Sequence, residues 1–482
     1  MIQPYSRALR ALVLPLLPLL LAACAGVSVP TSVSAPVPPT WQAALPHGGS
    51  LTNLADWWQQ QGDPLLAELV ASGQAVSPTV ATSRSRIAQA RSTQVATNAA
   101  LLPALNAVGS ASRGRSAQAG GPVAVPVATT VQAGLQAGWE IDVLGGRRAS
   151  LSAADQRLLG ADAQWHDARV SVAAEVASQY YALRSCRAQA DIAQRDAQSR
   201  GETARLSALS AKAGFTAPAI DALARASAAD ARNRAIRQTA VCAIDLKTLV
   251  ALTGMPEVEI ELKMGFPHVP STYFASISIA SLPAEVLAQR PDVFSAGRDV
   301  AAASAEVSAA DAARYPALSL SGSLGTARVR ADGVTASLDS WSVGPLSLTV
   351  PLFDGGRRVA DLQAAEARYV EAASVYRARV RQAVREVEEA LVNRQSAEAR
   401  QQDTATALEG FRASFAGSEA LYKNGLASLL DLEDARRSLL AAEINSVVLQ
   451  QERLAASVSL YRAAGGGWQQ GLHLWPPTRR LE

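Results

Sequence analysis

Two aspartates, Asp431 and Asp434, stand three residues apart, so an α-helix through them would carry both carboxylates on one face. They follow the turn signal at Gly425 and would therefore lie in the first turns of a new helix. Carboxylates in that position are stabilised by the positive end of the helix dipole. Helix stabilisation is one interpretation of this pair, and a role in selecting ions is the other.

No arrangement of residues predicts an enzyme or a metal centre. The sequence has no GxSxG, HExxH or P-loop motif, and no histidine is paired with a candidate nucleophile. We therefore expect no catalytic residue, no metal and no cofactor. The four histidines lack the spacing of metal ligands, and they are His47, His166, His268 and His473.

The N-terminus predicts export and lipid attachment. Arg7 and Arg10 precede an apolar run, residues 11–23, that is too short to span a bilayer, and this is the pattern of a signal peptide over residues 1–23. The residues before Cys24 read Leu-Ala-Ala and resemble the bacterial lipobox, in which the cysteine is acylated and becomes the new N-terminus. We expect acyl chains on Cys24 to anchor the mature protein in lipid.

The charge balance argues against nucleic acid as a partner. The whole sequence has a formal net charge of +3, and removal of a signal peptide with two arginines and no acidic residue lowers it to +1. No stripe of lysine and arginine with interleaved aromatic residues offers a surface that would follow a phosphate backbone.

The sequence contains one long internal repeat. Three pairs of matching segments have offsets of 213, 210 and 211 residues: 102–105 with 315–318, 145–148 with 355–358, and 212–215 with 423–426. This period is far longer than that of a solenoid repeat and indicates a duplicated domain. The predicted order is signal peptide, extended Pro- and Ser-rich tether, first repeat, second repeat and tail, at 1–23, 24–56, 57–265, 266–466 and 467–482.

Each repeat is predicted to contain two strands of roughly ten residues. Helical segments end at Pro103 and Pro316, and apolar and polar residues then alternate, most clearly over 131–143. The pattern slips at Gly344-Pro345, which indicates a bulge or bend. Loops are expected at 113–128 and 326–339. The alternation fits a transmembrane strand and also a soluble, half-buried hairpin.

Four strands cannot close a barrel in a membrane, where a sheet must have no open edge. A membrane interpretation therefore requires oligomerisation. Three copies would give twelve strands.

Two long helical hairpins complete the predicted architecture. Helical stretches at 150–213 and 359–423 are some 60 residues long, which corresponds to roughly 90 Å. Each returns through a short turn into a second helix, at 219–253 and 429–463. The abundance of Ala, Leu, Arg, Glu and Gln suits coiled-coil packing.

The chain resembles the TolC/OprM superfamily of outer-membrane factors, in particular its NodT-type efflux lipoproteins. The stretch LPAEVLAQRPDV at 282–293 is similar to the family pattern LPxxLLxxRPD, and AADAARYPAL at 309–318 is similar to AxxAxxxPxxxL. Tyr315 stands where the family usually has Phe. The resemblance covers the chain from Cys24 to about Gly466.

The resemblance implies an α+β membrane protein that forms a trimeric channel-tunnel. A twelve-stranded β-barrel in the outer membrane, with four strands from each chain, would continue into a long periplasmic α-helical barrel. Its expected partners are a periplasmic adaptor protein, an inner-membrane RND-type pump and outer-membrane lipid. Its expected function is a passive exit duct for small molecules in a tripartite efflux system. Protein secretion of type I and metal-ion export are the alternatives for the same fold.

The resemblance also assigns roles to residues at the tips of the hairpins. Asp431 and Asp434 match acidic residues that ring the narrowest part of the tunnel, and such a ring attracts cations. Tyr422 matches the family's gate tyrosine, and Asp221 matches its acidic partner on the neighbouring hairpin. The family's gate arginine has no counterpart, because Ala427 occupies that position.

Three further pairs of residues have structural interpretations. Arg290 and Asp292 are expected to cap the N-terminus of a helix. Glu140 and Asp142 are expected to line the lumen, although an ordinary solvated face explains them equally. Cys186 and Cys242 lie at similar distances on either side of the first hairpin turn, so they could be separate core residues or a disulfide, and an oxidising compartment favours the disulfide.

Overall fold

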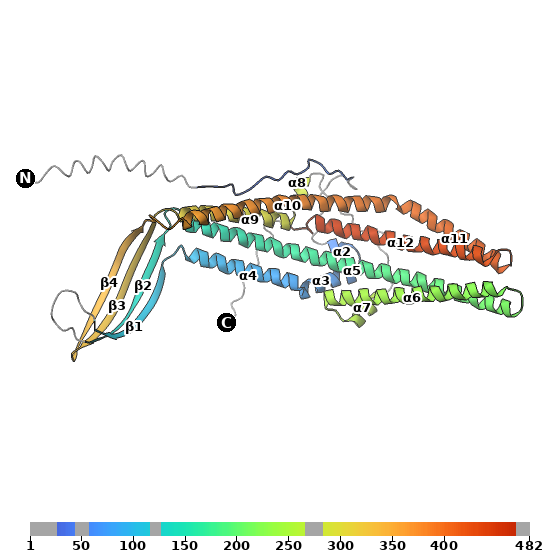
Figure 1. Cartoon of the computed structure of the whole chain (residues 1–482), viewed down its shortest axis with the longest axis horizontal. Coiled ribbons are helices and arrows are strands. Elements are labelled where there is room, and N and C mark those ends of the chain that lie inside the picture. Colours follow the sequence, from blue (N-terminus) through green and yellow to red (C-terminus); the bar gives the residue numbers. More distant parts are fainter. Residues whose placement is uncertain (1–26, 44–56, 116–126, 266–282, 469–482) are drawn as a thin grey trace, which may run out of the picture. The chain divides into compact units, whose positions relative to one another are not determined.

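The computed structural model describes residues 27–43, 57–115, 127–265 and 283–468. It consists of two compact units, and each unit takes segments from both halves of the sequence. The strands and the beginnings of the two long helices that follow them lie in the first unit, and the rest of the helical hairpins lies in the second (Figure 1). The repeats of the sequence are therefore not the compact units of the structure.

Four antiparallel strands form one sheet in the order β1-β2-β3-β4. Partner residues form rows across this sheet, and neighbouring rows point to opposite faces. One row is entirely apolar, with Ala107, Leu135, Leu324 and Trp341, and the next is entirely polar, with Asn106, Gln136, Ser323 and Ser342. The strands are β1 (Ala104–Gly114), β2 (Ala128–Ile141), β3 (Ala317–Ala331) and β4 (Val334–Thr349).

Strands β3 and β4 are longer than predicted. The loop expected over 326–339 is wrong, because the strands continue to a two-residue turn. Asp332 and Gly333 form this turn with φ of 48° and 82°, the left-handed conformation that tight hairpins need. The predicted slip at Gly344-Pro345 is confirmed as a shift in the β3–β4 register.

Long helices follow each pair of strands. The first repeat has α5 (Gly146–Lys212), of 67 residues, and α6 (Pro218–Thr253). In the second repeat, the stretch predicted as one helix is divided at Arg400 into α10 (Arg357–Ala399) and α11 (Gln401–Lys423). The shorter helices are α2 (Trp57–Gln60), α3 (Pro64–Val76), α4 (Pro78–Ala99), α7 (Glu257–Met264), α8 (Pro283–Ala288) and α9 (Pro291–Ala312), and α12 (Leu429–Ala463) completes the second hairpin.

Within the described part of the chain, no single helix has the length and apolar character needed to cross a membrane, although the bent pair α6 and α7 meets that test together.

An aspartate fixes the start of each long helix. Asp142 accepts hydrogen bonds from the backbone N–H groups of Arg147 and Arg148, at 3.1 and 3.0 Å. Asp354 does the same for Gly356 and Arg358, at 3.0 and 3.2 Å. These bonds satisfy N–H groups that have no partner inside a helix. Asp142 therefore caps α5, and its place in the lumen stays a prediction.

Glu140 is also paired. It forms an ion pair with Arg147, the residue whose backbone Asp142 caps.

A disulfide joins the two helices of the first hairpin, as predicted. Cys186 in α5 and Cys242 in α6 have their Sγ atoms 2.09 Å apart and their Cα atoms 5.5 Å apart. Nearer the tip, the buried residues between these helices are the small side chains of Ala197, Ala231 and Ala235. Small side chains let helix backbones approach closely, so the first hairpin forms a narrow pair (Figure 1).

We expect thiol counting on denatured, unreduced protein to find neither Cys186 nor Cys242 free. The bond joins residues 56 positions apart and would contribute about 4 kcal/mol of stability by the chain-entropy argument. Reduction should lower the thermal unfolding temperature, whereas a Cys186→Ala, Cys242→Ala double variant should not respond to reductant. Two free thiols in the untreated protein would disprove the bond.

The largest apolar core lies in the second unit. Trp57, which is 1% exposed, stacks on Tyr461 with ring centres 5.0 Å apart. Asp63 caps α3 by accepting the N–H of Leu66 and also accepts the Tyr180 hydroxyl at 2.7 Å. This core ties α3 and α5 to the end of α12.

Arg290 connects three helices of the second unit. Its guanidinium donates to Asp292 at 3.0 and 2.8 Å, to Glu386 of α10 at 2.7 Å and to the carbonyl of Ala463 at 3.0 Å. The residue is 5% exposed. The predicted helix cap is therefore only part of its role, because Arg290 also holds the start of α9 against α10 and α12.

The described part of the predicted tether is bound to helices. Val27 N–H donates to the buried Asp311 at 2.8 Å, and Ser304 donates to the Val29 carbonyl at 2.7 Å. Further along, the N–H groups of Gln42 and Ala43 donate to Glu388. Residues 27–43 have no helix or strand, as expected of a tether, but hydrogen bonds hold both ends of this segment. The predicted acylation site, Cys24, lies outside the described residues.

Candidate functional site

The candidate site is the pair of hairpin tips in the second unit. Both tips turn in the same way, through Gly214 with φ of 82° and Gly425 with φ of 73°. A hydrogen bond of 2.9 Å closes each turn, from Phe215 to the Ser210 carbonyl and from Leu426 to the Leu421 carbonyl. Glycine is needed here because other residues adopt this backbone conformation only under strain.

Asp431 forms a capping box at the start of α12. Its carboxylate accepts the backbone N–H of Ser428 at 2.9 Å, while the Ser428 hydroxyl accepts the N–H of Asp431 at 3.2 Å. The hydrogen bonds from the Ser428 side chain and backbone lower the pKa of Asp431 below its ordinary value. Within one chain, Asp431 therefore acts as a helix cap. Its side chain is still exposed beside the turn.

Asp434 lies on the same helix, one turn further along. It pairs with Arg437 at 3.3 Å, and both side chains are more than half exposed. Such an exposed pair contributes little to stability. Asp434 is thus free to interact with ions or with another chain.

Tyr422 and Asp221 do not form a hydrogen bond with each other among the described residues. Tyr422 packs against a small cluster of buried side chains that includes Ala224 of α6 and Leu432 of α12. Asp221 pairs instead with Arg225, four residues along α6, at 3.0 Å. Its second oxygen, Oδ1, is buried and has no partner within the described chain. Within the described part of the chain, Asp221 is therefore paired on its own helix, and Tyr422 lies in the apolar cluster between the hairpins.

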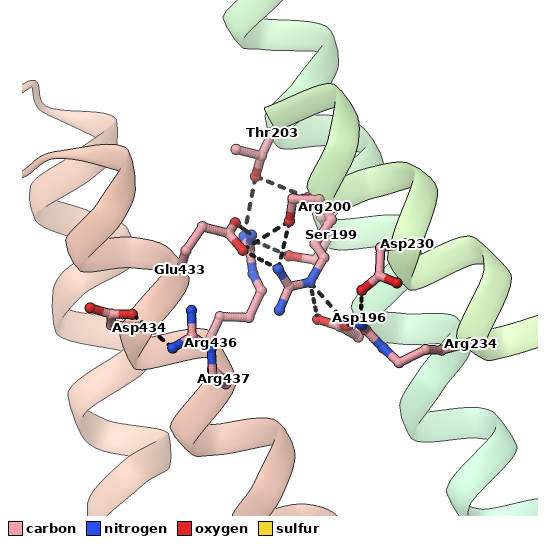
Figure 2. Close-up of polar contacts among 11 residues, drawn as sticks. Asp196, Ser199, Arg200, Thr203, Asp230, Arg234, Glu433, Asp434, Arg436 and Arg437 are labelled. Atoms are coloured by element: carbon pink, nitrogen blue, oxygen red, sulfur yellow. Dashed lines mark hydrogen bonds and ion pairs between the residues drawn. The ribbon is translucent and has the colours of Figure 1, made fainter. Parts of the chain in front are cut away.

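A cluster of charged residues next to the tips was not predicted. Figure 2 shows Glu433 and Arg436 of α12 facing Asp196 and Arg200 of α5, with Arg234 of α6 on the far side of Asp196. All four residues that face one another across the two hairpins are nearly buried, with 5% to 10% of their side chains exposed. Burial lowers the pKa of Arg436, although Glu433 opposes this effect.

Sequence spacing alone could not reveal this cluster. Glu433 lies eight residues after the turn at Gly425. If the two tips were level, its partner on α5 would lie eight residues before Gly214, at Leu206. The partner is instead Arg200. The two hairpins are therefore staggered along their axes. The signals in the sequence were two pairs within single helices, Glu433 with Arg436 and Asp196 with Arg200.

The geometry supports a tip that carries exposed negative charge on one hairpin and is held to the other by buried ion pairs. It contains no arrangement of nucleophile and base among the residues named above. Ion selection and conformational change are the chemistry that these residues can provide.

Most of the chain is similar to known outer-membrane proteins. The family described as outer membrane efflux protein matches residues 70–255 and 282–466. The chain is 32% identical over 474 residues to the pyoverdine export outer membrane protein OpmQ of Pseudomonas putida, covering 94% of this chain and 97% of that protein. It is 29% identical over 470 residues to outer membrane protein OprJ of Pseudomonas aeruginosa, covering 95% and 96%.

The fold has a close match among solved structures. The outer-membrane channel OprN superposes with a TM-score of 0.82 at 27% identity, covering 92% of this chain and 99% of that one.

Proposed function

The chain belongs to the outer membrane efflux protein family, and from this premise we propose how it works as the outer-membrane channel of a tripartite efflux system. Three copies join their sheets into one barrel in the outer membrane, and their helices continue as a tunnel in the periplasm. An adaptor protein and an RND-type pump open the tunnel at the hairpin tips. The channel itself carries out no reaction and lets the cargo pass.

The sheet is the observation that carries this proposal. Its row of Ala107, Leu135, Leu324 and Trp341 is wholly apolar, and the neighbouring row on the opposite face is wholly polar, as a wall between lipid and a water-filled lumen requires. Trp341 and Leu324, on the apolar face, are 77% and 60% exposed in the single chain. The order β1-β2-β3-β4 leaves β1 and β4 as edges, and only pairing with further chains removes them in lipid.

We propose small organic molecules as the cargo. One relative that matches nearly the whole chain is named for the export of pyoverdine. That cargo belongs to the relative, and for this chain it supports only the class of small organic molecules. Metal-ion export is less favoured, because only Met255 and Met264 remain in the mature chain to carry a soft cation. Secretion of a protein remains the alternative for the same fold.

The exposed pair Asp431 and Asp434 is proposed as the selectivity ring of the tunnel. Two carboxylates from each of three chains would meet near the three-fold axis, where they attract cations and disfavour anions. The proposal is supported by the position of both residues in the first turns of α12, directly after the tip. The packing of Tyr422 at the contact between the two hairpins suits a residue that moves when the tip opens.

Conductance tests the channel proposal. Purified protein added to planar bilayers should produce current steps of one size, and the smallest conducting particle should contain three chains. Co-expression with an RND-type pump and its adaptor should lower the accumulation of small organic dyes in cells that lack their own channel. Conduction by a single chain, or a trimer that passes no current in any condition, would contradict the proposal.

Lipid attachment at Cys24 is a separate part of the proposal. We expect Cys24→Ser to abolish incorporation of labelled palmitate while the protein still inserts into the outer membrane. Insertion persists because the barrel itself is held by the lipid. Cys186→Ser is the matched control and should keep the label. Label on the Cys24→Ser protein would show that the acylation site lies elsewhere.

A further inference from the structure

We propose that Glu433, with Arg200, Arg436 and Asp196, is a latch that holds the second hairpin against the first and so positions Asp431 and Asp434 for closure. This inference rests on the proposed channel function. The latch lies inside one chain, and its residues act as positioning residues for the gate.

Glu433 connects α12 to both helices of the first hairpin. Its carboxylate accepts hydrogen bonds from Arg200 of α5 and, at 3.0 Å, from Ser227 of α6. Arg436, one turn further along α12, donates to Ser199 at 3.2 Å and to Thr203 at 3.1 Å, both on α5 (Figure 2). Polar links therefore cross between the hairpins in both directions.

The charges of the cluster are balanced only while Glu433 is present. Glu433 binds both Arg200 and Arg436, whose side chains are 9% and 5% exposed. Asp196 binds Arg200 at 2.9 Å and also Arg234 at 3.2 Å. Without Glu433, Arg200 would keep only Asp196, and Arg436 would have no ion-pair partner among the described residues. Removal of one partner from a buried pair is strongly unfavourable, whereas removal of both partners is often tolerated.

The native apolar contact between the hairpins is limited on both sides of the latch. On the tip side, the first hairpin contributes to the buried cluster only the small side chains of Ala204, Ala224 and Ala228. On the other side is a cavity of about 200 Å³, lined by residues of α5, α11 and α12 that include Ile192, Phe415 and Leu440. The hairpins thus meet through little apolar surface near the cluster, and the ion pairs provide much of the attraction.

The latch is also placed to move the gate. Glu433 lies between Asp431 and Asp434 in sequence, within the first two turns of α12. Any displacement of Glu433 away from α5 carries the exposed carboxylates with it, because a helix moves as a rigid rod over so short a distance. A break in this cluster therefore changes the position of the proposed selectivity ring.

Single-channel recording of the full-length trimer tests the latch. Glu433→Gln keeps the shape of the side chain and removes its charge, and it should raise the fraction of time open and the mean conductance severalfold. Glu433→Leu combined with Arg436→Leu removes a balanced pair and should return both quantities toward those of the unmodified protein. The matched control is Glu452→Gln on the same helix, where Glu452 pairs with Arg400 but is 44% exposed. That control should behave as the unmodified protein.

If Glu433→Gln does not assemble, Ser227→Ala decides the question. It removes the hydrogen bond that Ser227 donates to Glu433 and the one that it accepts from Arg200, and it leaves every charge, so a smaller increase in opening is expected. A Glu433→Gln channel as closed as the unmodified one overturns the latch. If the unmodified protein forms no channel, the proposed function fails, and that result is distinct from failure of the latch.

Discussion

Replacement of Asp431 and Asp434 together by alanine is expected to remove most of the channel's preference for cations. In a trimer, the pair places six carboxylates, two from each of three chains, around the narrow end of the tunnel. Because its hydrogen bonds with Ser428 lower the pKa of Asp431, its charge should persist in mildly acidic solution. Reversal potentials across planar bilayers with a salt gradient measure the preference.

Block by trivalent cations provides a second measure of the same ring. Trivalent ions added on the periplasmic side should block the unmodified channel and leave the double variant open. The matched control is Ser428→Ala, which removes the hydroxyl of the capping box, costs about 1 kcal/mol of helix stability and keeps both carboxylates. If the double variant keeps its selectivity and its block, the aspartates serve only the helix, and the constriction lies elsewhere.

Replacement of Arg290 by methionine is expected to destabilise the helical unit by about 3 to 5 kcal/mol. The variant leaves Asp292, which is largely buried, and Glu386 without their shared cation. Thermal unfolding followed by circular dichroism should show a markedly lower midpoint. Arg385→Met is the matched control, because Arg385 pairs with Glu389 at 2.6 Å with both side chains more than half exposed. It should change stability by less than about 1 kcal/mol.

The pH dependence separates a lost ion pair from lost packing. Burial by itself would raise the pKa of Asp292, but the hydrogen bonds and the charge of Arg290 lower it below its ordinary value. A lowered pKa stabilises the folded protein above the ordinary carboxyl pKa of about 4, and this contribution is lost as the pH falls through the folded value. In Arg290→Met that contribution is absent, so its stability deficit should shrink as the pH falls below about 4. A deficit that stays constant with pH would show that Arg290 acts by packing alone.

The sequence was sufficient for the elements that depend on local patterns. Alternating apolar and polar residues located the four strands, and the slip at Gly344-Pro345 is a shift of register in the sheet. The length of β3 and β4 was missed, although polar and apolar residues alternate from Thr326 to Ala331 as they do in a strand. Asp332-Gly333 was the stronger signal, since this pair favours a two-residue hairpin turn.

The features that depend on contacts between distant segments could not be predicted. Arg290 was predicted as part of a helix cap because Asp292 lies two residues away in the sequence. Its other partner, Glu386, lies 96 residues away and could not be recognised. The latch required the stagger of the two hairpins, which results from packing and not from the length of either hairpin. The pair Asp431 and Asp434 was recognised in the sequence. The proposed ring needs three chains, so the structure of one chain gives only the contacts of this pair within that chain.

The most direct test of the account is a cryo-electron microscopy map of the full-length protein in a lipid nanodisc. We predict three chains whose strands β1 to β4 close one barrel of twelve strands. We also predict that the carboxylates of Asp431 and Asp434 lie at the narrowest section on the three-fold axis, with Glu433 bonded to Arg200 in each chain. A sheet with open edges, or aspartates that face away from the axis of a closed trimer, would contradict the account.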